Sequence, residues 1–189
     1  MIIKSFFQKL RGAYERYSSE RREVVKESGD ALSLAKQAIF AFHRDDREKG
    51  EELLAAARVI QGKLAKRFQK IPALVWEGSY RAMLEEYVEA SLYGSYLRGE
   101  KIGEVRVFGL DEDAYLGGLL DFTGELSRRA VTEATKKNIA EVRRAHAAAE
   151  AVMGELIKLN IAGPLRPKYD QAKTNFRKLE EILYDLSLR

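Results

Sequence analysis

Hydrophobic residues recur along most of the chain at intervals of three and four positions, which is the spacing of amphipathic helices. Short polar runs and the residues glycine and proline interrupt this pattern, as in Ser28-Gly29-Asp30 and in the string NIAGPLRP. Residues 99–110 include a β-like stretch, EVRVF, and we expect a loop or a small hairpin there. The pattern predicts seven helices, over about residues 4–27, 31–44, 45–70, 72–99, 112–136, 139–159 and 168–187.

The last predicted helix carries the most regular apolar stripe. Its members step by 3, 4, 3, 4 and 3 positions and are Tyr169, Ala172, Phe176, Leu179, Leu183 and Leu186. This spacing is typical of a helix that packs along another helix. We therefore expect a helical partner, either within the chain or in another copy of it.

The composition favours an all-α protein. Hydrophobic residues make up 46% of the chain and charged residues 33%, with only 3 prolines, as expected of a globular protein built from amphipathic helices. A chain of 189 residues is long enough for one well-filled core. We therefore expect a single domain over residues 1–189.

The composition also limits the location and the partners. The absence of cysteine excludes disulfides and thiolate metal sites and suits a reducing cytoplasm. The first ten residues lack the apolar run of a signal peptide, and no stretch is apolar enough to span a membrane. We expect a cytoplasmic protein without membrane contact. The formal net charge of +4 fits an ordinary solvated surface and does not by itself indicate nucleic-acid binding.

Two glutamates fall in unusually apolar surroundings in the segment LEEYVEA, residues 84–90. A helical wheel places Glu86 and Glu89 among aromatic and aliphatic residues, whereas Glu85 lies on an ordinary solvated side. Because burial disfavours an isolated charge, Glu86 and Glu89 need a neutralising group. Basic residues within the core are one solution, and a bound cation is another.

A second acidic pair lies in the segment YLGGLLDFTGELSRR, residues 115–129. Asp121 and Glu125 are four positions apart and share one helical face, which is either solvated or functional. Gly117 and Gly118 lie about one turn before Asp121. Two glycines inside a helix cost about 2 kcal/mol relative to alanines, so we expect another backbone or a substrate to approach closely here.

Other catalytic arrangements are missing from the sequence. With two histidines, no cysteine, and no glycine-rich phosphate loop or serine nucleophile motif, the available chemistry falls to carboxylates. If the two helices are neighbours, Glu86, Glu89, Asp121 and Glu125 can converge and repel one another. Ligation by oxygen alone selects a hard ion such as Mg²⁺ or Mn²⁺, which would suit phosphodiester hydrolysis.

The sequence resembles the translin family, and specifically its catalytic branch, translin-associated factor X. The resemblance is carried, in the family's order, by SFFQKLRGAYERY, SGDALSLAKQAIFAFHR, LEEYVEA, YLGGLLDFTGELSR and KYDQAKTNFRKLEEILYDLSLR. It implies a seven-helix bundle that assembles into a closed hollow octamer around RNA. It also implies Mg²⁺-dependent endoribonuclease activity, with catalytic acids at the positions of Glu86, Glu89, Asp121 and Glu125.

On this basis we expect Glu86, Glu89 and Asp121 to ligate Mg²⁺ or Mn²⁺. Glu125 is expected to be a further ligand or to orient the attacking water, so that cleavage leaves a 5′-phosphate and a 3′-hydroxyl. The expected substrate is mainly single-stranded RNA, and single-stranded DNA is a further candidate. The basic residues expected to hold the nucleic acid are Lys36, Arg44 and Arg128.

The short loop at residues 99–110 replaces a long insertion of the eukaryotic catalytic subunits, so the chain resembles an archaeal-type homologue. We expect a homo-octamer, with assembly beside a translin-like subunit as the alternative. One rival interpretation is a shell that binds RNA or single-stranded DNA without cutting it. A second is a structural scaffold that binds proteins through the 169–186 stripe. His43 is expected to serve packing or hydrogen bonding, and Tyr87, Tyr93 and Tyr96 are expected in the core.

Overall fold

The computed structural model describes residues 1–188, and within this range it is entirely helical. The predicted all-α class is therefore confirmed, while Arg189, included in the predicted domain, lies outside the described residues. The elements are α1 (Lys4–His43), α2 (Arg47–Lys70), η1 (Pro72–Trp76), α3 (Gly78–Arg98), α4 (Glu112–Thr135), α5 (Ile139–Leu156), η2 (Gly163–Leu165) and α6 (Arg166–Ser187), where η marks a 3₁₀ helix.

The predicted break at Ser28-Gly29-Asp30 is wrong, because α1 runs through it as one helix of 40 residues. One side of α1 is buried on both sides of the predicted break, and Val24 and Ala31 are both fully inaccessible to solvent. A glycine within a helix costs about 1 kcal/mol, which the burial of this side offsets. The described residues therefore form six α-helices rather than the seven that were predicted.

The remaining boundaries differ from the prediction by a few residues. Pro72 opens the short helix η1 instead of α3, because the chain is extended at Glu77 before α3 begins. Gly99 ends α3 with a left-handed backbone (φ 76°), which glycine adopts without strain. Residues 99–110 form the predicted loop, and no hairpin is present there.

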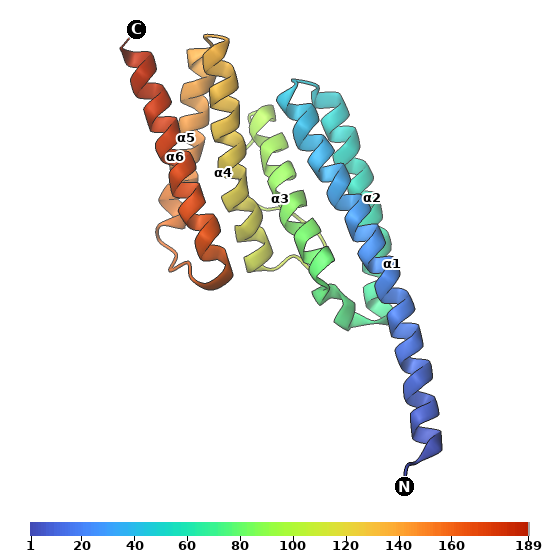
Figure 1. Cartoon of the computed structure of the whole chain (residues 1–189). Coiled ribbons are helices and arrows are strands. Elements are labelled where there is room, and N and C mark those ends of the chain that lie inside the picture. Colours follow the sequence, from blue (N-terminus) through green and yellow to red (C-terminus); the bar gives the residue numbers. More distant parts are fainter. Residues whose placement is uncertain (189) are drawn as a thin grey trace.

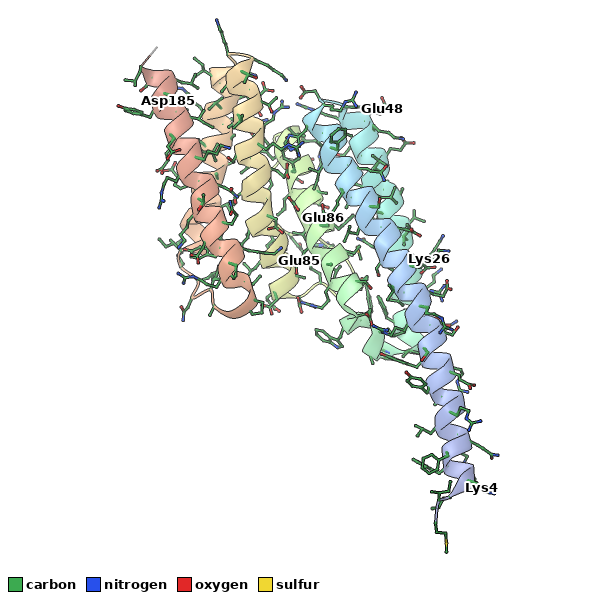
Figure 2. The ribbon with its side chains drawn as sticks, viewed as in Figure 1. Lys4, Lys26, Glu48, Glu85, Glu86 and Asp185 are labelled. Atoms are coloured by element: carbon green, nitrogen blue, oxygen red, sulfur yellow. The ribbon has the colours of Figure 1, made fainter. Side chains whose placement is uncertain are left out.

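Figure 1 shows α3 in the middle of the molecule, with α1 and α2 on one side and α4, α5 and α6 on the other. The N-terminal part of α1 extends past the other helices, and Figure 2 places Lys4 at the far end of this extension. Within residues 1–188, no helix combines the length and apolar character that crossing a membrane requires. The central place of α3 means that its acidic residues can reach α1 and α4.

The regular stripe of α6 packs inside the chain against α4 and α5. Ala172 and Leu179 have no exposed surface, and Phe176 lies with its ring centroid 5.3 Å from that of His146 on α5. The predicted helical partner is thus supplied by the chain itself. The packing within the chain therefore accounts for the stripe without a protein partner.

Candidate functional site

The backbones of α3 and α4 approach closely at the two adjacent glycines of α4. A Cβ atom on Gly118 would lie 2.4 Å from the backbone oxygen of Glu85, and one on Gly117 would lie 2.8 Å from the carboxyl carbon of the same residue. The expectation that a backbone lies against these glycines is confirmed. Because a larger residue would separate the helices, the glycines allow the acids of α3 and α4 to come near one another.

Glu89 is the buried acid of this region, with 8% of its surface exposed. Burial, and then the nearby charges of Glu125, Glu86 and Asp121, raise the pKa of Glu89 to about 9. Within residues 1–188, no basic side chain lies within 4 Å of its carboxyl group. Glu89 is therefore protonated at neutral pH, and the two acidic pairs lie close enough to repel each other.

Glu86 extends from α3 at the centre of the molecule (Figure 2), and 18% of its side chain is exposed. Burial raises its pKa, an effect that Lys36 opposes and that Asp121 and Glu125 reinforce. The Lys36 ammonium on α1 lies 3.5 Å from Glu86 Oε2. Glu86 thus belongs to the same electrostatic group as Glu89 but has a basic partner.

Asp121 is held by Lys168, which reaches it from α6. The same ammonium donates a hydrogen bond of 2.7 Å to Glu85. Burial favours the neutral form of Lys168, but the hydrogen bonds that its ammonium donates to Asp121 and Glu85 outweigh this effect and raise its pKa. Glu85 was expected on a solvated face, and this pairing, together with its contact to the glycines of α4, corrects that expectation.

Glu125 contacts the Nε2 atom of His43, which projects from the end of α1. The Tyr93 hydroxyl lies 3.1 Å from the other ring nitrogen of His43, so this histidine connects α1, α3 and α4. Only 7% of the His43 side chain is exposed. The predicted hydrogen-bonding role of His43 is therefore confirmed. Arg128 lies 3.8 Å from Glu125 and remains largely exposed.

The four acids do not form the carboxylate cluster that the sequence suggested. Within residues 1–188, no three acidic or histidine side chains are placed to hold one metal ion. Three of the acids have basic partners, which are Lys36 for Glu86, Lys168 for Asp121, and His43 for Glu125. The oxygen donors suit a hard divalent ion in chemical type. In this conformation, however, the basic partners occupy the places next to the carboxylates.

Lys36 and Arg128, two of the three residues expected to hold nucleic acid, border this acidic site. The side chains of Lys36 and Arg128 are 61% and 54% exposed, and Arg44 follows directly after α1. By contrast, Tyr87, Tyr93 and Tyr96 are buried, so the prediction that they belong to the core is confirmed.

The sequence did not identify Lys168 as a site residue. Lys168 lies 47 positions from Asp121 and 83 from Glu85, so local spacing gives no sign of the contact. Lys168 lies two positions after Arg166, and a basic pair of this kind indicates phosphate contacts rather than a partner for Asp121.

A model of the Translin family matches residues 19–189 of this chain. Translin from Gallus gallus is 35% identical over 85 residues, which are 44% of this chain and 37% of that protein. Translin from Homo sapiens is 34% identical over 83 residues, which are 43% of this chain and 36% of that protein. The matched segments thus span little more than a third of these curated relatives.

Among solved structures, AfC3PO is 21% identical with a TM-score of 0.89, covering 96% of this chain and 97% of that one. A complex of AfC3PO with duplex RNA gives a TM-score of 0.87 at 20% identity, covering 96% of both chains. The apo-NeC3PO structure gives 0.84 at 24% identity, covering 94% of this chain and 95% of that one. These likenesses establish the fold, and the match of the family model to most of the sequence establishes that the chain belongs to the Translin family.

Proposed function

We propose that this protein binds RNA and cleaves single-stranded RNA with the help of Mg²⁺ or Mn²⁺, as a member of the catalytic, translin-associated factor X branch. RNA binding is supported by the likeness of its fold to AfC3PO, which has been solved in complex with duplex RNA. The assignment to the catalytic branch is supported by the four acids in EYVEA and DFTGE. Single-stranded DNA is a second ligand of the same chemical type.

The observation that carries this proposal is the environment of Glu89. Its buried carboxyl group lacks a basic partner within residues 1–188. The charges of three further acids, on α3 and α4, also raise its pKa. An acid cluster that served stability alone would be expected to place a cation beside its most buried member. A bound divalent ion would supply that missing charge.

In this proposal Glu86, Glu89 and Asp121 hold the ion. When bound, Mg²⁺ polarises a phosphodiester and lowers the pKa of a coordinated water. Glu125 orients the attacking water, and His43 fixes the position of Glu125 through their contact. Lys36 and Lys168 now neutralise Glu86 and Asp121, and with the ion in place their ammonium groups would be available to phosphate oxygens.

We further propose that the protein assembles in the cytoplasm as a hollow homo-octamer of archaeal type, or beside a translin-like subunit. This part rests on the family resemblance and on the agreement of the fold with the C3PO structures. A native mass measurement of the purified chain tests it. A monomer at micromolar concentration would contradict the homo-octamer, and restoration of a large assembly by an added translin chain would support the mixed one.

The catalytic proposal is tested by incubating end-labelled single-stranded RNA with the protein in Mg²⁺, Mn²⁺ or EDTA. We expect products with a 5′-phosphate in either metal and intact RNA in EDTA. Asp121→Asn or Glu89→Gln should slow cleavage by roughly 100-fold or more, because a bound cation supplies several kcal/mol of transition-state stabilisation. Glu150→Gln, at an exposed position of α5, is the matched control and should cut like the wild type.

The second candidate is a Translin-family protein that binds RNA or single-stranded DNA without cutting it. It is favoured by the basic partners of three acids and by the lack of three convergent ligands within residues 1–188. Retarded but intact RNA in both Mg²⁺ and EDTA would establish this function in place of the nuclease. Cleavage by Asp121→Asn at the wild-type rate would equally remove the roles assigned to the acids.

A further inference from the structure

A groove of about 470 Å³ lies between α1 and α2, next to the acidic site. The residues of the groove that matter here are Ser33, Lys36, Gln37, Phe40, Arg44 and Lys49. Lys36 belongs both to this groove and to the acidic site, because its ammonium reaches Glu86. One end of the groove therefore lies beside Glu86 of the acidic site.

An exposed aromatic ring forms part of the groove. Phe40 is 55% exposed, although its neighbours Ile39, Ala41 and Phe42 are buried. The guanidinium carbon of Arg44 lies 5.8 Å from the centre of the Phe40 ring. An aromatic face beside a cation is the arrangement that proteins use to stack the bases of single-stranded nucleic acids.

The charge of the groove favours an anionic ligand. Within residues 1–188, Arg44 has no carboxylate within 4 Å, so its charge is available to a ligand. Lys49 contributes a further cation, although it is paired with Glu52 at 2.7 Å. Asp46 also borders the groove, but its carboxylate accepts a hydrogen bond from the backbone of Lys49 and caps α2.

The spacing of these residues gives the groove a direction. Lys36, Phe40 and Arg44 are four positions apart, which places them along one side of the helix and its end. A strand that follows this line would pass from the acidic site over the aromatic ring to the arginine. The order of the side chains is therefore cation, ring, cation, which matches alternating phosphates and bases.

We propose that this groove is a subsite for single-stranded RNA, in which one base stacks on Phe40 and the adjacent phosphates contact Lys36 and Arg44. The subsite rests on the proposed function, since it would hold the nucleotides next to the scissile bond. A folded protein partner is less suited to it, because a single exposed ring between cations offers little apolar area for protein docking.

The test measures the binding of fluorescent single-stranded RNA by anisotropy in EDTA, where no cleavage occurs. Phe40→Ala should weaken binding about tenfold, whereas Phe40→Tyr should keep the affinity, because stacking requires only an aromatic face. An RNA with abasic positions should bind the wild type and Phe40→Ala equally. Trp76→Ala is the matched control, since Trp76 is 65% exposed and has the Arg81 guanidinium 5.5 Å from its ring.

The phosphate contacts are tested separately with Arg44→Gln. This variant should weaken normal and abasic RNA alike and lower the slope of log affinity against log salt by about 0.7, the value for one lost phosphate contact with a single strand. Normal binding by Phe40→Ala, or an equal loss for abasic RNA, would overturn the stacking subsite while leaving RNA binding intact. A wild-type protein that binds no RNA would overturn both this subsite and the proposed function.

Discussion

Two buried glutamates of this protein have opposite surroundings. Glu133, near the end of α4, is 3% exposed and accepts hydrogen bonds from Lys136 at 2.9 Å and from Asn138 at 2.8 Å. Arg129 adds a further contact at 3.5 Å. Glu89, on α3, is buried to a similar degree and has no such partner within residues 1–188.

The comparison distinguishes a buried glutamate that neighbouring bases neutralise from one that has no basic partner. The Glu133 group is complete, because Arg129 also pairs with Asp45 at 2.6 Å and approaches Glu141 at 3.5 Å. Its acids and bases neutralise one another without an external ion. Around Glu89 the nearby bases contact the other acids, so burial and then the charges of Glu125, Glu86 and Asp121 raise the pKa of Glu89.

Removing the central base of the complete group should have the largest effect on stability. Arg129→Met leaves Glu133 and Asp45 with fewer partners and should lower the free energy of unfolding by about 3–5 kcal/mol. Urea denaturation followed by circular dichroism measures this change. A loss below 1 kcal/mol would show that Lys136 and Asn138 neutralise Glu133 unaided and would weaken the contrast with Glu89.

Substitution of Glu89 is expected to raise the stability of the protein instead of lowering it. The folded state keeps the proton up to about pH 9, whereas an unfolded glutamate releases it near pH 4.5, so wild-type stability falls as the pH rises between these values. Glu89→Gln removes this dependence and should stabilise the metal-free protein at pH 8 by on the order of 3 kcal/mol. Melting curves in EDTA at pH 4 and pH 8 test it. An equal difference at both pH values would mean that Glu89 does not hold a proton.

A substitution that disturbs the close approach of α3 and α4 is expected to lower stability by a smaller amount. Gly118→Ala forces a Cβ atom against the Glu85 backbone and should destabilise the protein by about 2 kcal/mol. Gly29→Ala is the control, because a Cβ atom there meets nothing within 4 Å and alanine favours the helix. The control should be slightly more stable than the wild type. If both variants behaved alike, the glycines would not be what allows the acids to approach.

The smallest effect is expected at the partly exposed Lys168. Lys168→Met should cost about 1 kcal/mol in EDTA, since it leaves Glu85 and Asp121 without their shared ammonium. Added Mn²⁺ should raise the melting temperature of this variant more than that of the wild type, because the ammonium no longer competes for Asp121. A response to Mn²⁺ equal to that of the wild type would separate Lys168 from the proposed ion site.

The sequence predicted those parts of the structure that depend on local patterns. The ranges of most helices, the loop at 99–110 and the stripe of α6 follow from apolar spacing within each segment. The false break at Ser28-Gly29-Asp30 was predicted from the local breaking residues alone, without the burial that keeps α1 continuous through them. Spacing within one segment carries no information about such contacts with other helices.

The candidate site also has features that local sequence predicts and features that depend on contacts between helices. The burial of Glu89 and the role of the paired glycines could be predicted, because both follow from residues on one helix. The partners of Asp121 and Glu125 come from α6 and α1, and no pattern near these acids indicates Lys168 or His43. The metal ion, its ligands and the octamer stay predictions.

The proton on Glu89 has a further chemical consequence. Any divalent ion that binds this carboxylate must first displace the proton, so uptake of the ion would release acid below about pH 9. The affinity for Mg²⁺ or Mn²⁺ would then increase with alkalinity, and the heat of binding measured by calorimetry would change with the ionisation enthalpy of the buffer. Glu89 would thereby make loading of the ion a proton-exchange reaction.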